Sequence, residues 1–274
     1  MKSGRTARAV IAVSVVGVVL AGCSTSRTGS ADAGDAGPES QAASARYTSS
    51  AELLERLSAD GTTVVVGNPE ARSVVHLLED PRCPVVEEFE RTGAKAVRKL
   101  VLSREIRVEY TFASFKDDRL GGDGSKRAVN ALRAALDRGK FVEYHAVLFR
   151  NQVVVEGSGG FTTERLLKLA DQVPGLRSAA FDAAVRTMKY KAFVTASEKA
   201  YENTGDDPNG PGTPSLVVNG HQLEGGLFAA AFREELLTRL VVDLHDRPAR
   251  WSTFWVPFGQ RVEAQWEAEE SQES

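Results

Sequence analysis

Apolar residues in the middle of the chain alternate between strand-like runs and helical repeats. Short β-branched runs at 62–66, 73–78 and 106–112 predict strands, with a turn between the first two. The run at 73–78 is almost continuously apolar, which is typical of a central strand buried on both faces. From Pro84 onward apolar residues recur at helical spacing, and proline is favoured at the first helical position. Strand, helix and strand in this order predict a right-handed parallel crossover.

The remaining patterns are mostly helical. Gly93 weakens the helix that begins at Pro84 without interrupting its pattern. The Asn219-Gly220 pair predicts a hairpin between strands at 215–218 and 222–224. The other predicted helices lie within 51–58, 125–204 and 228–242.

The N-terminus has the pattern of an export signal. A positively charged stretch precedes an apolar run over 9–20, which is short for a membrane span but suits the core of a signal sequence. The string Leu20-Ala21-Gly22-Cys23 follows and resembles a bacterial lipoprotein box, in which the cysteine is acylated. We therefore expect a signal peptide over 1–22 and lipidation on Cys23, which would hold the protein on the extracytoplasmic face of the cell membrane. An ordinary secreted protein with a chance cysteine is the alternative.

Composition changes sharply at both ends of the predicted folded part. Residues 23–48 are almost all small or polar and predict a disordered tether. The extension 243–274 is aromatic at first and acidic over 267–274, where we expect fraying. It contains all three tryptophans: Trp251, Trp255 and Trp266. We expect the aromatic part to fold back on the domain; an anchor for a partner or for the membrane interface is the alternative.

Charge and motif content exclude several functional classes. The chain has 34 Lys and Arg residues against 37 Asp and Glu, with no basic cluster, so we expect no nucleic-acid partner. The four histidines are scattered without metal-ligand spacing, and no phosphate-binding loop is present, so we expect no metal and no cofactor. We expect His145 to be a packed helix residue and His221 to be exposed on the hairpin, neither of them catalytic.

Cys83 is the main candidate for chemistry. It lies in the sequence Asp80-Pro81-Arg82-Cys83-Pro84-Val85-Val86. The only other cysteine is Cys23, the expected lipid attachment site, so no internal disulfide is expected. A thiol at the start of a helix is placed to act as a nucleophile. Asp80 is expected to cap or brace the turn before it.

Three stretches carry further motifs, in a consistent order. They are the strand, turn and helix of 74–90, the helix start Gly139-Lys140-Phe141-Val142-Glu143-Tyr144-His145, and the loop and hairpin Gly212-Thr213-Pro214-Ser215-Leu216-Val217-Val218-Asn219-Gly220. Together they resemble the DsbA-like branch of the thioredoxin superfamily over roughly residues 62–242. The resemblance implies an α/β fold, thioredoxin-like, with an inserted helical subdomain.

The resemblance also implies a layout of the folded part. Its segments would be a first thioredoxin-like part over 49–124, the helical insertion over 125–205 and a second thioredoxin-like part over 206–242.

The implied family role is thiol-disulfide exchange on exported proteins, with Cys83 as the catalytic cysteine. Val86 stands where the family has its resolving cysteine, and Leu77 stands where it often has a buried acid. The resemblance further makes Pro214 the cis-proline of the family. Thr213 before it would pair with a bound peptide, and Pro84 would lie beside the substrate.

Two functions follow from these residues. The first is monothiol exchange through Cys83, which would need an external reductant or a companion oxidoreductase. The second is a catalytically degenerate module that binds exported peptides or a partner at the cis-proline edge. In both, the lipid anchor would join the protein to the membrane.

Overall fold

The computed structural model describes residues 46–273, which belong to one compact unit over Ser44–Ser274. The predicted signal peptide, Cys23 and most of the predicted tether lie outside the described residues. Within 46–273, no helix is both long and apolar enough to cross a membrane.

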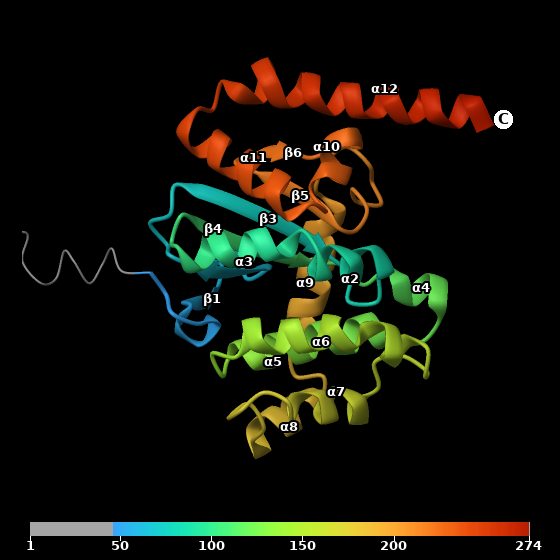
Figure 1. Cartoon of the computed structure of the whole chain (residues 1–274). Coiled ribbons are helices and arrows are strands. Elements are labelled where there is room, and N and C mark those ends of the chain that lie inside the picture. Colours follow the sequence, from blue (N-terminus) through green and yellow to red (C-terminus); the bar gives the residue numbers. More distant parts are fainter. Residues whose placement is uncertain (1–45, 274) are drawn as a thin grey trace, which may run out of the picture. The chain divides into compact units, whose positions relative to one another are not determined.

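A six-stranded mixed sheet forms the centre of this unit (Figure 1). Its strands are β1 (Glu55–Leu57), β2 (Thr63–Gly67), β3 (Ser73–Glu79), β4 (Ile106–Phe112), β5 (Ser215–Val218) and β6 (His221–Gln222). The strand order is β1-β2-β4-β3-β5-β6, and only β3 and β4 run parallel. The predicted parallel pairing of the strands on either side of the Pro84 helix is therefore confirmed. Although β2 and β3 are adjacent in sequence, β4 lies between them.

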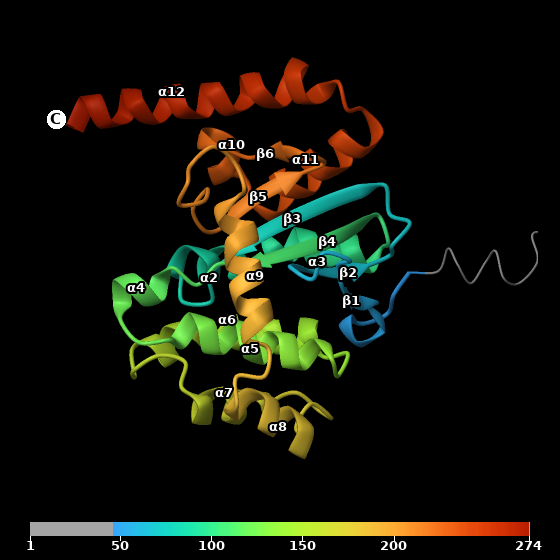
Figure 2. The same ribbon diagram turned by 180° about the vertical axis from the view of Figure 1, so that it is seen from behind.

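The helices cover both faces of the sheet and form a separate layer beyond it. They are α2 (Pro84–Arg91), α3 (Ala94–Leu102), α4 (Lys116–Leu120), α5 (Gly124–Leu136), α6 (Phe141–Glu156), α7 (Thr163–Ala170), α8 (Ala179–Arg186), α9 (Lys191–Glu202), α10 (Gly225–Ala230), α11 (Glu234–Asp246) and α12 (Val256–Glu273). Helices α3 and α11 pack together on one side of the sheet, and α9 packs against β4 from the other side (Figure 2).

The prediction of a helix over 51–58 was wrong. A single 3-10 turn, Ser50–Glu52, precedes β1, which pairs with β2 at the sheet edge. The Glu55 carboxylate accepts hydrogen bonds from the backbone N–H groups of Phe141 and Val142, at 2.9 and 2.8 Å. Glu55 thus satisfies two backbone N–H groups that have no partner within α6. The periodicity of the sequence does not reveal this stabilising contact.

Two predicted helices are each divided in two. The first breaks between α2 and α3 at Gly93, where a Cβ atom would lie 1.9 Å from the carbonyl oxygen of Ala231. This close approach of two backbones requires glycine. The last predicted helix, 228–242, is replaced by α10 and α11. Ala231, the residue that Gly93 approaches, lies between these two helices.

The helical insertion and the sheet share one hydrophobic core. Buried side chains from both contribute to it, including Phe89 on α2, Phe112 on β4, Leu132 on α5 and Phe141 on α6. Helix α6 also packs along α2. The shared core holds the insertion against the helix that carries the candidate thiol.

The aromatic extension folds back on the domain, as predicted. Trp255 ends a five-residue π-helix, Trp251–Trp255, and its side chain is 1 % exposed. Trp251 stacks on His221 with ring centroids 4.3 Å apart. His221 is therefore half-buried, and the prediction that it is exposed was wrong because it did not foresee this aromatic partner.

Helix α12 then crosses α10 closely. A Cβ atom on Gly226 would lie 2.2 Å from the carbonyl oxygen of Gly259, so two glycines meet at the crossing. Beyond the crossing α12 continues as helix to Glu273, which contradicts the predicted fraying from 267 onward. Trp266, in this outer part, is 42 % exposed.

Candidate functional site

Cys83 lies at the N-terminus of α2, directly before Pro84 at the first helical position. Its backbone carbonyl accepts hydrogen bonds from the N–H groups of Val86 and Glu87, which begin the helix. Its Sγ donates to the carbonyl oxygen of Thr213 at 3.1 Å. The residue is 2 % exposed and packs against Val86 and Phe149. The candidate thiol therefore lies at the start of the helix, as expected, but is almost fully buried.

The loop that meets Cys83 contains the Thr213–Pro214 peptide bond, which is cis, as expected. Tyr201 on α9 holds this loop, because its hydroxyl accepts a hydrogen bond from the Gly212 N–H at 3.0 Å. The hydroxyl of Thr213 is shielded from solvent and has no hydrogen-bond partner. The structure thus brings Cys83, Pro84, Thr213 and Pro214 together at one end of the sheet.

The two positions where this chain departs from the expected pattern are apolar and buried. Val86 and Leu77 are both 0 % exposed, Val86 beside Cys83 and Leu77 within the main core. Val85 is turned outward, and 39 % of it is exposed. Cys83 is the one cysteine among residues 46–273, so no second thiol there is available to it.

The turn before Cys83 is braced by buried charges. Asp80 accepts hydrogen bonds from the backbone N–H groups of Arg82 and Lys116 and from the hydroxyl of Ser125. This confirms the predicted bracing role. Burial raises the pKa of Asp80 to about 6, although these hydrogen bonds oppose the rise.

Arg82 connects the same turn to the helical insertion. Its guanidinium pairs with Asp117 and with Glu156, each at 3.0 Å, and donates to the carbonyl oxygen of Gly121 at 2.8 Å. The side chain is 9 % exposed, so this positive charge is already neutralised within the protein. It fixes α4 and the end of α6 against the turn that carries Cys83.

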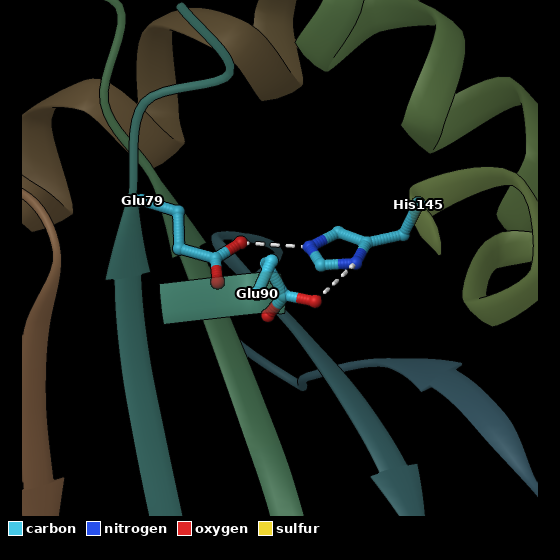
Figure 3. A group of neighbouring side chains, drawn as sticks. All are labelled: Glu79, Glu90 and His145. Atoms are coloured by element: carbon cyan, nitrogen blue, oxygen red, sulfur yellow. Dashed lines mark hydrogen bonds and ion pairs between the residues drawn. The ribbon is translucent and has the colours of Figure 1, made fainter. Parts of the chain in front are cut away.

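A second buried polar group lies between the sheet and α6 (Figure 3). Nε2 of His145 lies 2.7 Å from Oε2 of Glu79 at the end of β3. Nδ1 of the same ring lies 3.9 Å from Oε2 of Glu90 on α2. All three residues are at least nine-tenths buried. His145 therefore bridges two carboxyl groups through its opposite nitrogens.

Burial controls the protonation of this group. It raises the pKa of Glu79 to about 8 and that of Glu90 to about 7, and it lowers the pKa of His145. Near neutral pH we therefore describe the Glu79–His145 pair as a neutral carboxyl group bonded to a neutral imidazole. Glu90 also pairs with Arg98 at 3.2 Å, which favours its ionised form.

These three residues are also the group in the described chain that could hold a metal ion. Their ligand atoms lie within 4.8 Å of one another. However, the two nitrogens of His145 face different acids, an arrangement for hydrogen bonding rather than for one shared ion.

The sequence does not predict this group. Glu79 lies four positions before Cys83, whereas the family resemblance places a buried acid at position 77, where this chain has Leu77. The available signal was the polar residue Glu79 at the end of an apolar strand, together with a histidine on the apolar face of α6. His145 was expected to be packed, which is correct, but its two acidic partners could not be inferred.

A thioredoxin family model matches residues 59–236. A search of curated protein sequences finds no match.

Solved structures share the fold at low sequence identity. MdbA, a thiol-disulfide oxidoreductase from Actinomyces oris, is 21% identical with a TM-score of 0.56, covering 68% of this chain and 86% of that one. BdbD from Bacillus subtilis is 17% identical with a TM-score of 0.56, covering 70% and 96%. DsbA from Chlamydia trachomatis is 19% identical with a TM-score of 0.54, covering 66% and 91%.

The family match spans strands β2 to β6, the turn with Cys83, the helical insertion and the cis-proline loop described above. The chain belongs to the thioredoxin family, with the DsbA-like form of its fold.

Proposed function

We propose that this protein is a lipid-anchored, extracytoplasmic member of the family that engages exported polypeptides at the Thr213–Pro214 edge and exchanges disulfides through Cys83 alone. The observation that carries the proposal is the 3.1 Å contact between Cys83 Sγ and the Thr213 carbonyl oxygen. It joins the single thiol to the backbone edge that would pair with a peptide.

The proposed chemistry is one exchange step. The Cys83 thiolate attacks one sulfur of a substrate disulfide, a new Cys83–substrate S–S bond forms, and the other substrate sulfur leaves as a thiolate. No net oxidation occurs in this step. Release of the substrate needs a second thiol from outside the chain, because Val86 occupies the resolving position. That thiol would come from an external reductant or a companion oxidoreductase.

The proposed location depends on the N-terminal sequence. A charged stretch, a short apolar run and Leu20-Ala21-Gly22-Cys23 follow one another in the order of a lipoprotein signal. Export would also place Cys83 in a compartment that permits disulfides. Globomycin treatment of expressing cells should block processing and leave the precursor, whereas processing that is insensitive to the drug would contradict the lipid anchor.

A second candidate function is supported by the burial of the thiol. Cys83 is 2 % exposed, which is unusual for a nucleophile that must meet a protein disulfide. In this alternative the protein binds peptides or a partner at the cis-proline edge without turnover.

The alkylation rate of Cys83 against pH distinguishes the two candidates. The full chain with Cys23→Ser has Cys83 as its only thiol. Monothiol exchange predicts that iodoacetamide modifies the native protein at a rate within about tenfold of the unfolded chain. Modification that occurs only after unfolding would remove the exchange function and leave the binding module.

A further inference from the structure

A groove of about 690 Å³ leads away from the candidate site along α4, α9 and the loop 207–213. Thr213 lines it, and the carbonyl of the same residue contacts Cys83. A chain that pairs with Thr213 would therefore continue into this groove. Its wall includes Phe115 and Tyr201, whose stacked rings have centroids 5.6 Å apart.

The groove carries an excess of negative charge. Its lining includes the four acidic residues Asp118, Glu198, Glu202 and Asp207. The two lining cations, Lys116 and Arg119, both lie over the ring of Phe115, at 5.5 and 5.2 Å from its centroid. These cations are thus held on the aromatic face.

The acidic residues of the groove differ in the partners that their carboxylates already have. Glu202 is exposed and makes no ion pair within residues 46–273, whereas Asp118 lies 4.0 Å from Lys126. Asp207 is exposed and accepts a hydrogen bond from the Asn209 N–H in its own loop. A cationic ligand can therefore reach Glu202 and Asp207 without displacing another positive side chain.

We infer that the groove selects basic, extended polypeptide segments, with Lys or Arg near the position that meets Thr213 and Cys83. This inference rests on the proposed function, because it names the substrate class of the same edge. Carboxylates along the groove would attract the cationic side chains of such a segment. An acidic segment would meet uncompensated like charges.

The test uses the full chain with Cys23→Ser and Cys83→Ser, so that binding is measured without covalent capture. Two fluorescein-labelled peptides share one apolar, extended core and differ only in having Lys or Glu at the flanking positions. Anisotropy titration at low salt should give about tenfold tighter binding of the Lys peptide, and the preference should shrink as salt is added.

Charge variants test whether Glu202 and Asp207 cause the preference for the Lys peptide. Glu202→Gln alone, and Glu202→Gln with Asp207→Asn, should reduce the preference, the double variant to within about twofold. The control pair Glu70→Gln with Asp246→Asn makes the same change in net charge, because both residues are exposed and neither lines the groove. It should leave the preference unchanged. Equal binding of both peptides, no binding, or an equal loss in the control pair would overturn the inference.

A parallel experiment keeps failure of this inference separate from failure of the proposed function. With Cys83 intact, each peptide is supplied with a cysteine held as a mixed disulfide to 5-thio-2-nitrobenzoate. Transfer onto Cys83 at equal rates from both peptides would keep the thiol function and overturn the charge selection. Transfer from neither would overturn the thiol function itself.

Discussion

At the scale of single residues, the site combines a covered thiol with an unusual concentration of buried ionisable groups. Cys83 touches Thr213, while Arg82 and Asp80 on the same turn are committed to structural contacts. Glu79, at the end of β3, bonds to His145 rather than to the thiol. The residues next to Cys83 thus hold its turn in place, and Val86 is the position where a substitution could add a resolving thiol.

Val86→Cys should restore a dithiol. Val86 is one helical turn after Cys83 and packs beside it, so the new thiol would have the spacing of a Cys-x-x-Cys motif. Replacing a buried valine by the smaller cysteine should cost about 1 kcal/mol. In the full chain with Cys23→Ser, maleimide-polyethylene glycol gel shifts across glutathione redox buffers should show a reversible two-electron oxidation. A folded variant that stays fully reduced in oxidised glutathione would show that the site cannot close a disulfide.

Glu79→Gln should change how stability depends on pH. The native pKa of Glu79, about 8, lies above the ordinary value of 4.5, so the folded protein resists ionisation that the unfolded chain undergoes. The wild type should therefore lose stability as pH rises from 5 to 8, by on the order of 3 kcal/mol relative to the variant, which cannot ionise there. Urea unfolding at several pH values measures this difference.

Glu88→Gln on the exposed side of α2 is the matched control and should follow the wild-type pH profile. Parallel pH profiles for the wild type and Glu79→Gln would mean that the carboxyl group of Glu79 ionises normally in the folded protein.

At the scale of elements, two close backbone contacts fix how the C-terminal part attaches. Gly93 allows the α2–α3 corner to approach Ala231, and Gly226 allows α12 to cross α10 at Gly259. Downstream of β6, α11 packs against α3 and β3, and Trp255 belongs to the same hydrophobic core. The extension is therefore part of the domain up to its crossing with α10.

Gly226→Ala should loosen this crossing. The added methyl group would meet the Gly259 carbonyl and the Val262 side chain, so either the two helices move apart or α12 undocks. We expect a loss of about 1–3 kcal/mol in the free energy of unfolding, measured by urea denaturation. Gly157→Ala at the exposed end of α6 is the control and should change stability by about 0.5 kcal/mol or less. An unchanged free energy in Gly226→Ala would mean that α12 does not depend on this contact.

The elements also show how far sequence reasoning reaches. Strands β2, β3 and β4 and the start of α2 at Pro84 follow from local patterns, because each depends on neighbouring residues. The cis-proline loop was expected from the family resemblance instead. The breaks at Gly93 and between α10 and α11 do not, because they depend on contacts between distant segments. The Glu79–His145–Glu90 group is missed for the same reason: its members come from three elements that meet only in the fold.

At the scale of the whole molecule, the helical insertion, the sheet and the aromatic extension share one core, and the candidate site lies where the insertion meets the sheet. The proposed function requires that Cys83 and the Thr213–Pro214 edge act as a single monothiol site.

The most direct test is mixed-disulfide formation by the native full chain carrying Cys23→Ser. The chain is mixed with a disulfide-bonded extended peptide, quenched with acid and analysed by intact mass. We expect one peptide per chain, attached at Cys83, formed on the folded protein and released by added dithiol. No adduct on the folded protein, with full adduct formation once it is unfolded in urea, would contradict this expectation.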